Sequence, residues 1–166
     1  DNMNDEKGQL SGEYMLLVGS LIVVLMISIF MIANENELNI AMAAAKSGAD
    51  EGVASSSSAI YPKETFNEYD GLEGLKHPYS VSIVNVSYNS SGIDENYGKQ
   101  KIQFKVYAKA SADYNKKELD SIGDRINYNL RKSVATSFNT TDSTNKLYNP
   151  VFSNNYVFTT ANVVWV

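Results

Sequence analysis

The sequence predicts an α+β fold in which a long N-terminal hydrophobic helix precedes a small antiparallel β-sheet domain with one packed amphipathic helix. Three observations predict this fold. An uncharged apolar run covers residues 14–33. Two segments between residues 79 and 110 alternate apolar and polar residues, as strands do. Apolar residues also recur at helical spacing between Leu119 and Phe138. At 166 residues, the chain has room for one such helix and one domain of about 100 residues.

The composition argues against several classes of function. The formal net charge is -5, and Lys and Arg form no dense basic block, so we expect no nucleic acid partner. There is no cysteine, which excludes disulfides and thiol chemistry. The single histidine has no partner pattern, and there is no glycine-rich phosphate loop, so the sequence predicts no enzyme, no metal site and no cofactor.

The apolar run from Tyr14 to Ala33 is interrupted only by Gly19, Ser20 and Ser28. A helix of about 20 residues is roughly 30 Å long, the thickness of the hydrocarbon core of a bilayer. Because its apolar residues occur on all sides, we expect lipid or other apolar helices around it. Glu13 stands at the head of the run, where a charge is costly unless a cation meets it. The alternative is an interfacial glutamate in the first helical turn, favoured by the helix dipole.

The residues that lead into this run are Lys7-Gly8-Gln9-Leu10-Ser11-Gly12-Glu13-Tyr14. Together with the apolar run, which extends the match to Ala33, they resemble the class III signal peptide of archaeal type IV pilin-like proteins. The resemblance implies that a prepilin peptidase cuts between Gly8 and Gln9 and that the apolar helix is retained, unlike that of a secretory signal peptide. It also implies that Ser11, Glu13 and Tyr14 act in assembly, with Glu13 meeting the freed amine of a neighbouring subunit's Gln9.

The resemblance further implies a function and a set of partners. The chain would be a pilin, the structural subunit of an archaeal type IV pilus-like surface filament that serves adhesion or surface attachment. Its partners would be its own copies, the cytoplasmic membrane before assembly, the prepilin peptidase, and an assembly platform with its ATPase. Residues 1–8 would be a leader-like segment, 9–60 the helix with its extension, and 61–166 an extracellular globular domain. A monomeric membrane-anchored binding protein and a minor pilin are the alternatives.

Helix propensity continues beyond Ala33, and nothing forbids a single helix as far as about Ser55. The small residues between Ala41 and Gly52 either allow close helix approach or reflect helix propensity alone. A flexible serine-rich tether is the alternative to a rigid stalk. Tyr61–Pro78 is expected to form a loop. Its His77 is interpreted as a lone loop histidine rather than a metal ligand or catalytic base.

Two strands are expected at Tyr79–Tyr88 and Lys101–Ala110, paired as an antiparallel hairpin. In the first strand the apolar residues change faces at Ile83-Val84, which indicates a bulge there or a strand covered on both faces. The loop between the strands, from Asn89, is long for a hairpin. Its Asp94 and Glu95 are expected in a solvated turn, with calcium binding as the alternative. The inward residues of the second strand are Ile102, Phe104, Val106, Ala108 and Ala110.

Asn115 and Glu118 have the form of a capping box, which predicts the start of an amphipathic helix of about 20 residues. Its apolar stripe is expected to close over the sheet. A membrane-surface helix is the alternative, but the polar face lacks the cationic bias of such helices. Short strands are expected at Val151–Phe152, Tyr156–Thr160 and Asn162–Val166. Because the last residues are apolar and include Trp165, we expect them to form a sheet strand or a subunit contact.

Three tripeptides fit the acceptor pattern for N-linked glycosylation, at Asn85, Asn89 and Asn139. Asn89 and Asn139 are expected in loops. Asn85 falls inside an expected strand and is the weakest of the three. N-linked glycans on an extracellular domain are the only non-protein groups that the sequence predicts.

Overall fold

The computed structural model describes residues 2–54, 81–111 and 113–166. The chain divides into two compact units, Asp1–Leu38 and Asn39–Val166. We call the second unit the head and describe the two units separately. The expected loop Tyr61–Pro78 with His77, and the serine-rich tether that begins at Ser55, lie outside the described residues.

Helix α1 runs from Asn2 to Ala54. The helix reaches Ala54, the last residue described before the gap, and so confirms the expected extension beyond the apolar run. No proline interrupts this segment, and alanine dominates its later turns. The helix begins before Gln9, so the Gly8–Gln9 bond lies within it. The compact head begins at Asn39, so the last turns of α1 belong to the same unit as the sheet.

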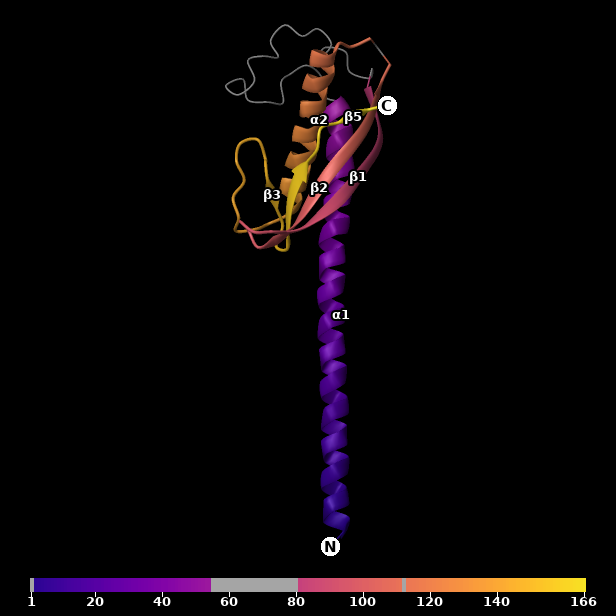
Figure 1. The fold of residues 1–166 in the computed structure, drawn as a ribbon, viewed down its shortest axis with the longest axis vertical. Coiled ribbons are helices and arrows are strands. Elements are labelled where there is room, and N and C mark those ends of the chain that lie inside the picture. Colours follow the sequence, from indigo (N-terminus) through magenta and orange to yellow (C-terminus); the bar gives the residue numbers. More distant parts are fainter. Residues whose placement is uncertain (1, 55–80, 112) are drawn as a thin grey trace. The chain divides into compact units, whose positions relative to one another are not determined.

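The sheet of the head is mixed, and the prediction of an antiparallel sheet is wrong in this respect. Strands β1 (Val81–Asp94) and β2 (Lys99–Ala110) pair antiparallel as predicted. Both β4 (Tyr156–Thr160) and β5 (Val164–Trp165) pair parallel to β2. The strand order is β1-β2-β4-β3, with β5 also beside β2 (Figure 1).

The parallel pairing arises from the connection between β2 and β4. Helix α2 (Lys116–Ser137) follows β2 and carries the chain back, so that β4 begins beside the first residues of β2, with Tyr156 opposite Gln100. A crossover helix of this kind is the usual way to make two strands parallel. The short strand β3 (Val151–Phe152) precedes β4 and pairs with it antiparallel.

The β1–β2 hairpin is longer, and its turn tighter, than predicted. The expected bulge is confirmed, because the register shifts between Ile83 and Asn85. The expected long loop from Asn89 is wrong, because β1 continues to Asp94 and β2 begins at Lys99. The Gly98 amide donates to the Asp94 carbonyl at 2.8 Å, and the Asn96 amide donates to the Asp94 carboxylate at 2.9 Å. Asp94 is therefore engaged in closing the turn.

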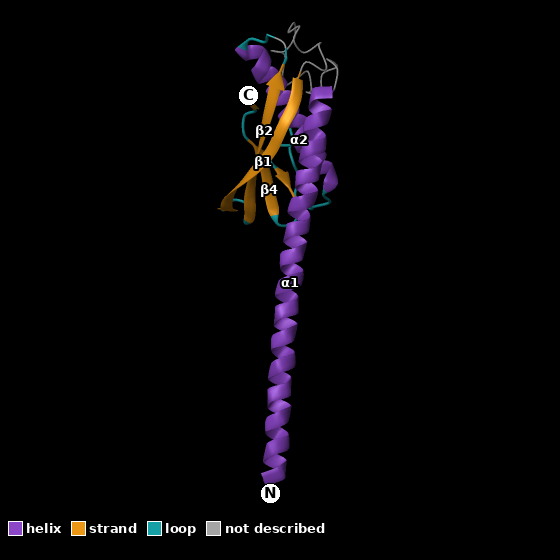
Figure 2. Cartoon of the chain, turned by 90° about the vertical axis from the view of Figure 1, so that its right-hand side faces the viewer, coloured by secondary structure: helices purple, strands orange, loops and turns teal. Residues whose placement is uncertain are grey.

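The core of the head lies on one face of the sheet, where α2 and the last turns of α1 cover it (Figure 2). Four of the five inward residues predicted on β2 are buried, and Ala110 is half-buried. Phe158 of β4 stacks on Phe104 at 5.6 Å between ring centroids and on Phe138 at 5.9 Å. These rings join the sheet to the C-terminal end of α2. The buried residues of β2 are Ile102, Phe104, Val106 and Ala108.

Within the head, α1 and α2 approach each other closely at two glycines. A Cβ atom placed at Gly48 would lie 2.8 Å from the Leu130 Cα atom, and one at Gly52 would lie 2.9 Å from the Ile126 Cα atom. Of the two explanations for the small residues between Ala41 and Gly52, close helix approach therefore accounts for the buried ones. Ala43 is exposed and is not explained in this way. The apolar stripe of α2 consequently packs against α1 as well as the sheet. The fully buried alanines of α1 are Ala41, Ala45 and Ala49.

The capping box at the start of α2 is confirmed. The Asn115 side chain accepts a hydrogen bond from the Glu118 amide at 2.9 Å, and its own amide group donates to the Glu118 carboxylate at 3.2 Å. Four residues of the predicted stripe are buried, whereas Leu119 and Phe138 at its ends are half-buried. This packing supports a core helix rather than a membrane-surface helix.

Candidate functional site

The first candidate site is the apolar part of α1 within the first unit, which we call the apolar surface (Tyr14–Ile32). Its large apolar side chains are 36–78% exposed, and they lie on all sides of the helix. Its two serines satisfy their hydroxyls internally: Ser20 donates to the Leu17 carbonyl at 2.9 Å and Ser28 to the Val24 carbonyl at 2.8 Å. Because their hydroxyls are bonded within the helix, the two serines are compatible with apolar surroundings. By length and composition, the helix could cross a membrane.

The residues assigned to processing and assembly lie at the N-terminal edge of this surface. Gly8, Gln9, Ser11, Glu13 and Tyr14 are all exposed on the isolated helix. Glu13 is the only charged residue between Lys7 and Glu35 in the sequence. A carboxylate in this position meets water in the isolated chain, and it would need a partner once apolar neighbours surround the helix.

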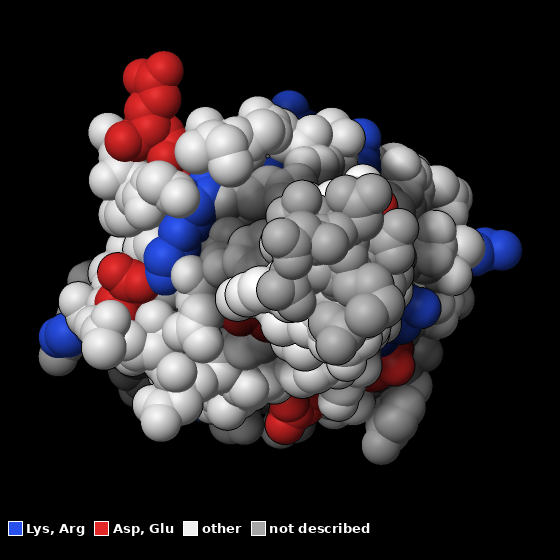
Figure 3. All heavy atoms as spheres, turned by 90° about the horizontal axis from the view of Figure 1, so that it is seen from below, with Lys and Arg blue, Asp and Glu red and all other residues white. Residues whose placement is uncertain are grey.

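Positive and negative side chains are interspersed on one face of the molecule. On the face seen in Figure 3, Lys and Arg side chains alternate with Asp and Glu, and no continuous basic patch forms there. The charges on this face therefore do not indicate a surface that binds nucleic acid.

The three candidate glycosylation sites are exposed. Asn85 and Asn89 both lie in β1, so the prediction that Asn89 lies in a loop is wrong, whereas Asn139 follows the C-terminal cap of α2 in a loop as expected. In the hairpin register, Asn85 is opposite Tyr107 and Asn89 is opposite Gln103. Both asparagines therefore point to the outward face of the sheet, and both are exposed.

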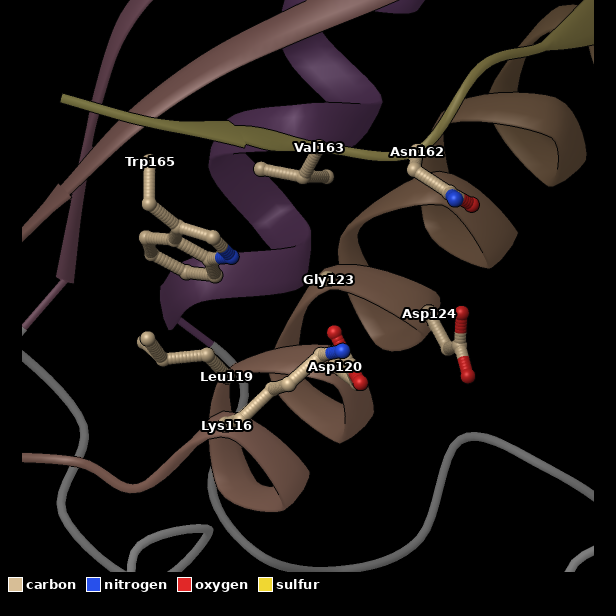
Figure 4. Close-up of a pocket in the computed structure, with 8 residues that line it drawn as sticks. All are labelled: Lys116, Leu119, Asp120, Gly123, Asp124, Asn162, Val163 and Trp165. Carbon is tan, nitrogen blue, oxygen red and sulfur yellow. The ribbon is translucent and has the colours of Figure 1, made fainter.

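The sequence did not predict a pocket of about 350 Å³ between α2 and the C-terminal residues of the head. Figure 4 shows Trp165 and Asp124 on opposite sides of this pocket, with Gly123 between them. Asn162 and Val163 line it from the segment that leads into β5. The residues that α2 contributes are Lys116, Leu119, Asp120, Gly123 and Asp124.

Gly123 allows the C-terminal segment to lie close to α2. A Cβ atom there would be 3.3 Å from the Val163 Cβ atom and 4.0 Å from the Trp165 ring. A hydrogen bond also holds this segment against α2, because the Asn127 side chain donates to the Ala161 carbonyl at 2.9 Å. On its other side β5 pairs with β2. The expectation that the apolar C-terminal residues form a sheet strand is confirmed.

Arg131 anchors the neighbouring stretch of chain. Its guanidinium donates to the Thr160 hydroxyl at 2.7 Å and to the Leu147 carbonyl at 3.2 Å and 3.3 Å, and the residue is only 8% exposed. This group therefore ties α2 both to the end of β4 and to the loop before β3. The Thr160 contact lies two residues before the pocket wall that begins at Asn162.

No protein-family model, curated protein or solved structure matches the chain. The candidate sites are therefore interpreted from their own chemistry. Among the residues that the structure describes, no group of three or more His, Asp or Glu side chains is placed to hold a metal ion.

The sequence contains features of the residues that line this pocket, but they do not show that these residues come together. Asp120 and Asp124 are four residues apart, so they lie on one side of α2. Trp165 is the single tryptophan of the chain, and its apolar surroundings indicated only a strand or a subunit contact. Nothing in the sequence placed β5 beside α2, because that placement depends on the parallel pairing with β2.

Proposed function

We propose that this chain is a structural subunit of an archaeal type IV pilus-like surface filament, which assembles by packing its apolar surface against copies of itself. The observation that carries the proposal is a helical segment with apolar side chains exposed on all sides and one carboxylate at its N-terminal edge. Lipid would cover these side chains before assembly, and neighbouring helices would cover them afterwards. The resemblance of residues 7–33 to a class III signal peptide supports the same function.

In this proposal Glu13 sets the axial position of each subunit. An isolated charge among apolar helices is costly, and the cost is offset only when an opposite charge lies next to it. The freed amine of a neighbouring subunit's Gln9 would supply that charge. A Cβ atom added at Gly12 or Gly19 would meet no atom within 4 Å on the isolated chain, and such small residues favour close helix packing in apolar surroundings.

The head would coat the filament and make its contacts with surfaces, which fits a role in adhesion. Glycans at Asn85, Asn89 and Asn139 would project from exposed positions. Those at Asn85 and Asn89 would share the outward face of the hairpin, away from the core. The precursor would reside in the cytoplasmic membrane and the filament at the cell surface.

Filament formation with a Glu13→Ala variant tests the proposal. Surface material from cells that make the wild-type chain should contain thin filaments of it in negative stain. The Glu13→Ala chain should stay in the membrane without forming filaments. Glu35→Ala is the matched control, because it removes an exposed carboxylate at the other boundary of the apolar run, and it should form filaments normally. Normal filaments with Glu13→Ala would contradict the role of this residue.

The second candidate function is a monomeric membrane-anchored surface protein with a binding head. The same helix supports it, because one apolar helix long enough to span a bilayer also serves as an anchor. The absence of filaments from wild-type cells, with the chain recovered as membrane-bound monomers, would favour this function. Mass spectrometry of the N-terminal peptide tests processing separately, since cleavage before Gln9 leaves Gln9 as the first residue.

A further inference from the structure

The pocket beside Trp165 has room for one small ligand. Its volume of about 350 Å³ is at the lower end of the range typical of small-molecule sites, which is about 300–1,000 Å³. The half-buried Trp165 and Val163 form an apolar wall, and Gly123 leaves the floor between α2 and β5 without a side chain (Figure 4). Larger ligands would extend into solvent from this position.

The polar groups of the pocket define the ligand chemistry. Asp120 and Asp124 supply carboxylate oxygens, Asn162 supplies an amide that both donates and accepts, and Lys116 supplies an ammonium donor. Two carboxylates disfavour an anionic ligand, and the Lys116 ammonium offsets part of the negative charge that would attract a cationic one. A wholly apolar ligand would strip water from these groups without replacing its hydrogen bonds. A neutral molecule with several hydroxyl groups can donate to the carboxylates and accept from the amide and ammonium groups.

The tryptophan wall of the pocket further narrows the class of ligand. An indole offers a flat apolar surface with one polar group at its edge. A pyranose ring has a face of C–H groups that can lie on such a surface, and its hydroxyls both donate and accept hydrogen bonds. We propose that this pocket binds a neutral sugar ring, either a free hexose or a hexose unit of a surface glycan. Such binding goes beyond the proposed function and holds for a filament subunit and a monomeric anchor alike.

The single tryptophan makes sugar binding directly measurable. The full chain, in a detergent without a sugar head group, is titrated with glucose, galactose and mannose while Trp165 fluorescence is recorded. We expect a saturable change with at least one of these sugars and a Kd on the order of a millimolar, because the pocket is open and the contacts are few. Glucuronate and tetramethylammonium serve as the anionic and cationic probes, and they should give no saturable change.

Two variants at exposed positions test whether the change in Trp165 fluorescence arises from sugar bound in the pocket. Asp120→Asn should weaken sugar binding by about 3- to 10-fold, the effect of one lost hydrogen bond, and Asp120→Asn with Asn162→Ala should weaken it further. Glu95→Gln is the control, because it changes an exposed carboxylate in the β1–β2 turn. The proposal is overturned if no sugar gives a saturable change, if only the cation does, or if the double variant binds as tightly as the wild type. None of these outcomes depends on whether filaments form.

Discussion

The close contact between α1 and α2 at Gly48 gives the sharpest test of the head. In a Gly48→Ala chain the new Cβ atom would lie 2.6 Å from the Asn129 carbonyl oxygen, 2.6 Å from the Ser133 Cβ atom and 2.8 Å from the Leu130 Cα atom. Two of these atoms are backbone, so the helices must separate. Overpacking of this kind costs about 1–3 kcal/mol, whereas alanine gains about 1 kcal/mol of helix propensity over glycine.

The two terms leave Gly48→Ala less stable by about 1–2 kcal/mol, because the backbone clash places the overpacking cost in the upper part of its range. For a domain of this size the midpoint Tm should fall by about 3–10 °C. Thermal unfolding of the full chain in detergent, followed by near-UV circular dichroism, measures this shift. Gly52→Ala should lower Tm less, because only one atom lies within 3.0 Å of its new Cβ.

Gly19→Ala is the matched control, since the same substitution in the same helix meets no atom within 4 Å and lies outside the head. It should leave the unfolding of the head unchanged. A Gly48→Ala chain that unfolds at or above the wild-type temperature would contradict the steric cost at this contact, because helix propensity alone would then have decided the result.

Three further predictions concern the head. Arg131→Met should lower the stability of the head by about 2–4 kcal/mol, because Met cannot replace the buried hydrogen bonds to the Thr160 hydroxyl and the Leu147 carbonyl; chemical denaturation measures the loss. Asn115→Ala should cost about 1 kcal/mol through the lost N-cap, measured in the same way. The hydrogen bond from Lys99 lowers the pKa of Asp142 below its usual 3.8. This pair therefore stabilises the head above about pH 4, and its contribution is lost as the pH falls through the lowered pKa.

Each of these predictions has its own control. Lys132→Met changes an exposed neighbour of Arg131 and should have little effect, and equal losses from both variants would contradict the anchoring role of Arg131. Asn115→Ser retains a capping oxygen and should be close to wild type; a full loss of stability there would argue against the capping box. Asp142→Asn should weaken the acid dependence of unfolding, and an unchanged pH profile would contradict the pairing with Lys99.

The local features of the fold could be predicted from the sequence because short-range rules decide them. The capping box at Asn115, the bulge after Ile83 and the continuation of α1 to Ala54 each follow from a few neighbouring residues. The three C-terminal strands were also located, since apolar and β-branched residues alternate with turn residues there. The small residues of α1 left two explanations open, and only the structure could supply the partner helix that meets Gly48 and Gly52.

The features that the sequence did not predict depend on pairing across long distances in the chain. The stretch after Asn89 has weak strand propensity of its own, but pairing with residues of β2 holds it extended as far as Asp94. The direction of β4 leaves no mark in its alternation pattern, because parallel and antiparallel strands have the same two-residue period. The pocket beside Trp165 depends on that direction, so the sequence did not predict it either.

The position of β2 has a consequence for how the head folds. Its partner β1 is joined to it by a tight turn, but β4 and β5 reach it only after α2 and a long stretch of chain have intervened. Contacts between residues so far apart require large loops to close before any stabilisation is gained. Of the pairings that β2 makes, only the β1–β2 hairpin therefore forms from local contacts, and the head should fold more slowly than helical proteins of similar length. A newly synthesised chain completes its central strand pairing only once β4 and β5 are available.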